Sequence, residues 1–171
     1  LRDILLRKAS DDFDWSEISP PIFGALFEST LNPETRRSGG MHYTSIENIH
    51  KVIDPLFLND LRAELDTILA ISQENRRNQA LRDYQQRLAS LRFLDPACGS
   101  GNFLTETFLS LRRLENECLK ALLNDQSTLD FFDDRIFVNI HQFYGIEIND
   151  FAATVAKTAL WIAESQMVNE T

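Results

Sequence analysis

The stretch "DPACGSGNFL", residues 95–104, places small side chains and two glycines after an acidic residue, and then the chain turns apolar. The preceding segment "LRFLD" (91–95) is short and rich in Leu and Phe, which predicts a buried strand. The following segment, residues 102–123, carries apolar residues at helical spacing and predicts a helix. Gly99 and Gly101 are therefore expected at a strand-to-helix turn.

Such a turn directs backbone N–H groups and the positive end of the helix dipole beyond the carboxyl end of the strand. Glycine is needed where the backbone takes a positive φ or touches a ligand closely. Two readings follow for Gly99 and Gly101: a ligand site, or an ordinary Gly-rich connection, because a lone GxG is a weak signal.

The composition limits which classes of protein this chain can belong to. With 171 residues, 43% of them hydrophobic, and 12 Phe, the chain is long enough for one domain, or a domain and a half, with a real core. It has no membrane-length apolar run, and its two cysteines, Cys98 and Cys118, lack metal-ligand spacing. We expect a cytoplasmic protein with no metal site and no membrane contact. The net charge of −9 argues against this chain clamping a phosphate backbone by itself.

The two parts of the chain differ in pattern. Residues 1–90 are predicted to be nearly all helix, apart from a loop over 32–45. Within this part, helical periodicity is interrupted near Pro55. Residues 91–171 alternate strand, helix, strand and helix, which predicts a parallel α/β sheet with right-handed crossovers. The chain starts at Leu1 without Met, so we expect a piece of a longer protein.

The second predicted strand, residues 141–148, is followed by a helix over 149–167. Asn149 or Asp150 is the expected N-cap of that helix. One face of the helix carries small residues suited to packing on a sheet, namely Ala152, Val155, Ala156, Ala159, Leu160 and Ala163.

Glu147 stands at the end of the second strand. In dinucleotide-type folds an acidic residue here accepts hydrogen bonds from ribose hydroxyls, although a solvated carboxylate is the plain alternative. It follows the Gly-rich turn by far more than the roughly 20 residues of the NAD fingerprint. Gly101 is also followed by Asn, Phe and Leu, without the third glycine of that fingerprint. An NAD-dependent dehydrogenase is therefore the weaker assignment.

Three segments together resemble one family. "FLDPACGSGNFL" (93–104) resembles motif I of the S-adenosylmethionine-dependent DNA amino-methyltransferases, which methylate adenine N6 or cytosine N4. "YGIEINDFAATVAKTAL" (144–160) resembles motif II, and "GGMHYTS" (39–45) resembles motif X. These motifs are most similar to those of the adenine-N6 enzymes in large single-chain restriction-modification systems. The resemblance implies an α/β methyltransferase fold: a helical subdomain over 1–90, then the first, incomplete part of a Rossmann-like parallel sheet over 91–171.

The same resemblance implies S-adenosylmethionine as cofactor and gives residues their roles. Asp95 would face its ammonium, Glu147 its ribose hydroxyls and Ile148 its adenine ring. Gly99 and Gly101 would admit the methionine moiety to the main chain. The remaining residues implied in cofactor binding are Pro96 and Ala97 in the turn, Ser100 and Asn102 for the methionine carboxylate, Phe103 on the first helical turn, and Tyr43 and Thr44 of the motif X loop.

The family's catalytic tetrapeptide, Asn, Asp or Ser followed by Pro-Pro and an aromatic, is missing. "SPPI" (19–22) precedes motif I and ends in Ile, and "NPET" (32–35) lacks the second Pro. We therefore expect no catalytic residue and no methyl transfer by this fragment alone, with double-stranded DNA contacted by other parts of the parent protein. Three alternatives stay open: a cytosine-N4 methyltransferase fragment, a protein methyltransferase fragment, and a non-catalytic helical interaction module.

Overall fold

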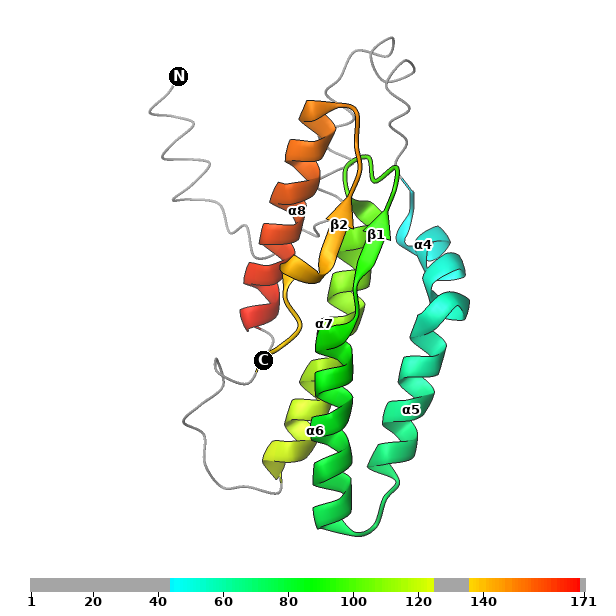
Figure 1. Ribbon diagram of the computed structural model, residues 1–171, viewed down its shortest axis with the longest axis vertical. Coiled ribbons are helices and arrows are strands. Elements are labelled where there is room, and N and C mark those ends of the chain that lie inside the picture. The colour runs from blue at the N-terminus through cyan, green and yellow to red at the C-terminus, as the bar shows by residue number, and fades with distance from the viewer. Residues whose placement is uncertain (1–43, 125–135, 170–171) are drawn as a thin grey trace.

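The computed structural model describes residues 44–124 and 136–169, the side chains up to Met167. The predicted helices over residues 1–31 and most of the motif X loop lie outside this part, as does Tyr43. The elements run in the order α4 (Ile46–Ile53), the π-helical turn η2 (Asp54–Leu58), α5 (Asn59–Leu69), α6 (Glu74–Ser90), β1 (Phe93–Asp95), α7 (Asn102–Asn124), the 3₁₀ turn η4 (Ile140–Gln142), β2 (Phe143–Gly145) and α8 (Asp150–Asn169). Figure 1 shows these elements as an elongated body.

The interruption predicted near Pro55 is confirmed, and it is a local widening of the helix. Proline has no N–H, and its ring clashes with the carbonyl one turn earlier. The backbone accommodates it in the π turn η2, which closes with Asn59 N–H donating to the Asp54 carbonyl. α4 and α5 therefore follow one another without a loop. Ser45 caps the start of α4 by accepting from Asn48 N–H at 3.4 Å.

The two strands pair in parallel, with Phe93 opposite Phe143 and Asp95 opposite Gly145. This confirms the parallel connection predicted by the strand–helix alternation. β2 is shorter than the predicted 141–148, because residues 140–142 form a 3₁₀ turn whose N-cap is Asn139. Within the described residues, the structure is mostly helical with a small two-stranded sheet.

α7 lies at the centre of the molecule, with α5, α6 and α8 packed around it (Figure 1). One hydrophobic cluster joins all four helices to β2, so helices on both sides of Leu91 share a core. Phe143 connects the sheet to this core. Its ring stacks on Phe93 at 5.3 Å between centroids and meets Phe108 of α7 edge-on at 5.6 Å. The division into units at residue 91 stays a prediction.

A buried ionic network fixes the chain as it enters β2. Glu115 of α7 is fully buried and forms an ion pair with Arg112. Its carboxylate also accepts from Gln85 Nε2 at 2.9 Å and from the backbone N–H groups of Phe137 and Val138 at 2.7 and 3.1 Å. A buried charge requires such compensation. The segment before η4 is therefore anchored on α7.

The N-cap of α8 is Asn149, whose Oδ1 accepts from Phe151 N–H at 3.0 Å and Ala152 N–H at 3.1 Å. All six residues of the small-residue face are buried, as predicted. Their chief neighbour is α7, however, and the expected packing on the sheet is wrong in that respect. Small side chains allow two helices to approach closely, which explains the composition of this face.

Candidate functional site

The Gly-rich turn lies at the carboxyl ends of both strands, beside the starts of α7 and α8 (Figure 1). Both turn glycines have positive φ, +53° at Gly99 and +81° at Gly101. A Cβ at Gly101 would lie 2.8 Å from Cβ of Ala156 in α8, so this glycine lets the helix approach. A Cβ at Gly99 would have no neighbour within 4 Å among the residues that the structure describes. Gly99 is therefore the position at which a ligand has room to reach the main chain.

Glu147 holds this turn. Its Oε2 accepts from Gly99 N–H at 2.9 Å, and its Oε1 accepts from Asn149 N–H at 2.8 Å. One carboxylate thus joins the turn after β1 to the start of the helix after β2. An ionised carboxylate has about four lone-pair positions, so two backbone bonds leave acceptor capacity for a ligand.

Asp95 ends β1 and is half-buried. Its Oδ1 accepts from Ala97 N–H at 3.0 Å, which closes a tight turn over the exposed Pro96. The Asp95 carbonyl accepts from Ile146 N–H at 2.9 Å, so the ladder between the strands continues one step beyond β2. Asp95 thus ends β1, whereas Glu147, predicted within the second strand, lies two residues beyond the end of β2 at Gly145.

The electrostatics of the turn are set by these two acidic side chains. Burial, followed by the nearby charges of Asp95 and Glu147, raises the pKa of the half-buried Cys98 thiol above its ordinary value. Cys98 is thus a neutral side chain packed under the turn; a Cβ at Gly145 would lie 2.6 Å from its Sγ. A site with two carboxylates and a neutral thiol is suited to a cationic ligand.

The remaining predicted residues fall in different environments. Ser100 and Asn102 are 5% and 6% exposed, so their side chains belong to the base of the turn. Ile148 is 98% exposed, directly after Glu147, and offers an unpartnered apolar surface within the described part of the chain. Thr44 is half-buried and immediately precedes the cap of α4. Tyr43, predicted beside it, lies outside the described residues.

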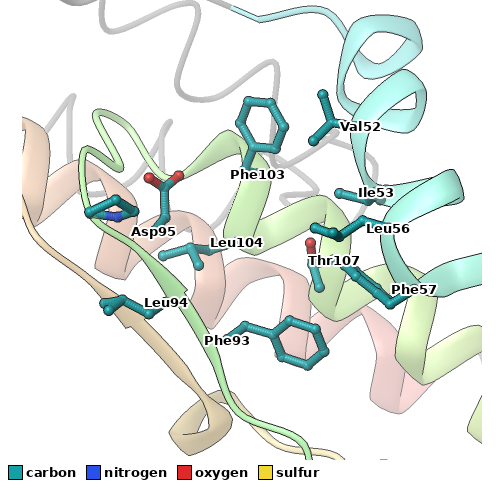
Figure 2. Close-up of a pocket in the computed structure, with 11 residues that line it drawn as sticks. Val52, Ile53, Leu56, Phe57, Phe93, Leu94, Asp95, Phe103, Leu104 and Thr107 are labelled. Atoms are coloured by element: carbon teal, nitrogen blue, oxygen red, sulfur yellow. The ribbon is translucent and has the colours of Figure 1, made fainter.

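A cavity of about 250 Å³ opens between α4 and the strand-turn-helix unit (Figure 2). Three predicted residues line it: Asp95, Pro96 and Phe103. The opposite wall comes from α4 and η2, and sequence reasoning missed it. This wall consists of Val52, Ile53, Leu56 and Phe57.

The wall on α4 and η2 has one feature that marks it as accessible. Val52 is 48% exposed and Leu56 is 70% exposed, although both are large apolar residues. In the sequence they continue the apolar periodicity of a core-facing helix, so pattern alone does not separate them from core residues. The other predicted residues that the structure describes do not line this cavity, namely Thr44, Ala97, Gly99 to Asn102, Glu147 and Ile148.

Comparisons with known proteins agree with this architecture. The chain is 42% identical over 167 residues to DNA methyltransferase A of Bacillus subtilis (strain 168), which covers 97% of this chain and 18% of that protein. It is 28% identical over 168 residues to a putative type II restriction enzyme and methyltransferase of Methanocaldococcus jannaschii, covering 86% of this chain and 14% of the relative.

Among solved structures, the type IIL restriction-modification enzyme MmeI in complex with DNA superposes with a TM-score of 0.81 at 42% identity. The match covers 91% of this chain and 20% of that enzyme, so the chain spans a fifth or less of these relatives. Residues 71–171, more than half of the chain, match the family described as MmeI, DNA-methyltransferase domain. The resemblance to the methyltransferase region of restriction-modification enzymes is thereby confirmed, and the chain belongs to the MmeI DNA-methyltransferase domain family.

Proposed function

We propose that this chain forms the S-adenosylmethionine site of a DNA adenine-N6 methyltransferase within a restriction-modification enzyme. The observation that carries the proposal is a pair of carboxylates just past two paired parallel strands, Asp95 ending β1 and Glu147 following β2, beside a turn whose Gly99 has no described neighbour at its Cβ position. The cofactor has an ammonium, a sulfonium and a ribose diol, and all three are suited to carboxylate partners. When bound, it supplies an activated methyl group.

The residue roles in this proposal are those that the family resemblance implies. Asp95 faces the ammonium of the methionine moiety, and Glu147 accepts from the ribose hydroxyls with its remaining lone pairs. Ile148, exposed beside Glu147, packs on the adenine ring. Gly99, with Pro96 and Ala97, lets the methionine moiety approach the main chain.

The rest of the site closes over the methionine moiety from two directions. Ser100 and Asn102 direct the start of α7 at its carboxylate, where the helix dipole is favourable. Phe103 of α7 lies on the wall of the 250 Å³ cavity and would contact the same moiety. Thr44, which directly precedes the cap of α4, would contact it from that side, and Tyr43 keeps the role that the family resemblance implies.

Direct titration of the 171-residue chain with S-adenosylmethionine, followed by calorimetry, tests the cofactor assignment. We expect one binding site, which S-adenosylhomocysteine also occupies and NAD does not. Binding of NAD would contradict the proposal. If neither S-adenosylmethionine nor S-adenosylhomocysteine bound, the proposal would also fail, and a non-catalytic helical module would be favoured.

We further propose that DNA is bound and methylated by a longer protein that contains this chain. The 171 residues lack the Pro-Pro-aromatic tetrapeptide that holds the flipped base in this family. Labelled S-adenosylmethionine and mixed-sequence duplex should therefore give unlabelled DNA with the isolated chain. With the longer enzyme, digestion of the product to nucleosides should release N6-methyladenine; N4-methylcytosine, or labelled protein, would support the other methyltransferase readings.

A further inference from the structure

His50 of α4 lies between two carboxylates that belong to different elements. Its Nδ1 is 2.7 Å from Asp54 Oδ1, at the start of η2, and its Nε2 is 3.1 Å from Glu106 Oε1 of α7. The Glu106 side chain is 4% exposed, whereas that of His50 is 31% exposed at the edge of a cleft of about 280 Å³. The imidazole therefore joins α4 to α7 and remains within reach of water.

The geometry determines the charge of this imidazole. A neutral imidazole has one N–H donor, so it satisfies only one of two facing carboxylates, whereas the imidazolium donates from both nitrogens. The hydrogen bond to Asp54 raises the pKa of His50 above 6.5; burial opposes this rise, and Glu106 reinforces it. The protonated form is thus the one that completes both contacts.

Each cationic side chain described around His50 pairs with a carboxylate, and one of them shares Glu106 with His50. Arg113 of α7 approaches Glu106 at 3.4 Å from the exposed side. Arg62 of α5 lines the same cleft and forms an ion pair with Glu117. On α4 itself, Lys51 pairs with Glu47 at 2.8 Å. When His50 loses its proton, Arg113 is the remaining cation on the buried Glu106 carboxylate.

The two helices joined by His50 carry opposite sides of the proposed cofactor site. α4 is capped by Ser45, which directly follows Thr44, and its residue Val52 lines the cavity beside Asp95. α7 begins at Asn102, directly after the Gly-rich turn. We propose that the His50 imidazolium is a positioning residue that holds α4 on α7 and so sets the distance between the two walls of the cofactor site. This proposal rests on the proposed function.

The apolar contacts of α4 determine how far it can loosen. Ile49 is fully buried and Ile53 is 3% exposed, so α4 stays attached when His50 is neutral. Because the pKa of His50 is raised in the folded protein, the stabilisation is complete below pH 6.5 and is lost as the pH rises through the folded-state value. Loss of the proton therefore weakens ligand binding without unfolding the protein.

The experiment compares the 171-residue chain with its His50→Gln variant. The imidazole signal of His50, assigned by its disappearance in His50→Gln, is followed by NMR from pH 5 to 9. S-adenosylmethionine affinity is measured over the same pH range. The cofactor's own ammonium also titrates, so the result is the ratio of the two affinities at each pH. The matched control is His141→Gln, which alters an exposed histidine of η4.

We expect His50 to titrate above pH 6.5 and Asp54→Asn to lower its midpoint. Wild-type affinity should exceed that of His50→Gln by about 5-fold or more at low pH, and the two should converge at high pH. His141→Gln should follow the wild type throughout. Two results would overturn the proposal: a His50 midpoint at or below 6.5, or a wild-type to variant ratio that does not change with pH. If the wild type binds no cofactor, the proposed function fails instead, and the positioning role falls with it.

Discussion

Glu147→Ala is the substitution that tests the site most directly. The Glu147 carboxylate accepts from Gly99 N–H at 2.9 Å and from Asn149 N–H at 2.8 Å, so it supports the Gly-rich turn as well as any ligand. An ordinary hydrogen bond contributes about 0.5–1.5 kcal/mol, and one to a charged group about 1.5–3 kcal/mol. Because Glu147 is half-buried, water replaces part of each lost bond. We therefore expect the free energy of unfolding to fall by about 2 kcal/mol.

The effect of Glu147→Ala on binding is separate from its effect on folding. In the proposed complex, the same carboxylate accepts from the ribose hydroxyls in a partly dry site. Loss of about 1.5–3 kcal/mol of charged hydrogen bonding corresponds to roughly 10- to 100-fold weaker S-adenosylmethionine binding. Calorimetry gives the affinity, and urea unfolding of the same samples gives the stability.

Glu74→Ala is the matched control for affinity. Glu74 is an exposed carboxylate at the start of α6, at the far end of the molecule from the strand ends (Figure 1). This variant should bind the cofactor as the wild type does. If Glu147→Ala binds as tightly as Glu74→Ala, with wild-type binding clearly measured, the ribose contact lies on another residue. Lower stability with unchanged affinity would make Glu147 a purely structural support of the turn.

Three further predictions concern stability and thiol chemistry. Gly101→Ala places a Cβ 2.8 Å from that of Ala156 at a φ of +81°. The free energy of unfolding, measured by urea denaturation, should therefore fall by about 1–3 kcal/mol. An unchanged denaturation midpoint would contradict the close contact between the turn and α8. Glu115→Ala removes the carboxylate that pairs with Arg112 and accepts from two backbone N–H groups, so the free energy of unfolding should fall by about 3–5 kcal/mol. A fall of less than about 1 kcal/mol would refute the buried network. Burial raises the pKa of the Cys118 thiol to about 12 and also raises that of the half-buried Cys98. At pH 8 a thiol reagent should therefore label Cys98 slowly and Cys118 only after unfolding. Equal labelling of both cysteines in the native protein would contradict the burial of Cys118.

The local pattern was sufficient to predict the order and type of most elements. Apolar residues at period 3.6 predicted α7 and α8, and Leu and Phe before the Gly-rich turn predicted β1, because these signals depend on neighbours within a few turns of chain. The strong N-cap preference of Asn likewise predicted the start of α8 at Asn149. The parallel pairing followed from the long helical connection between the strands.

Other features depend on contacts between distant parts of the chain. The sequence marked Gly99 and Gly101 as equivalent, but α8 passes beside Gly101 and leaves Gly99 open. It placed Glu147 in the second strand, but β2 ends at Gly145, and the bond that Glu147 accepts from Gly99 N–H, 48 positions earlier, appears only when the strands pair.

The side of the site formed by α4 also could not be predicted from the sequence. Periodicity alone does not distinguish the exposed Leu56 of the cavity wall from the buried Ile49 of the core, since both continue one helical pattern. His50 and Glu106 are 56 positions apart and meet only because α4 packs on α7. The sequence by itself thus determined which elements form and the residues in the motifs, because those depend on local propensity and hydrophobic period. Only the tertiary structure decided which side chains meet, because burial, close approach and charge pairing arise between segments far apart in the chain.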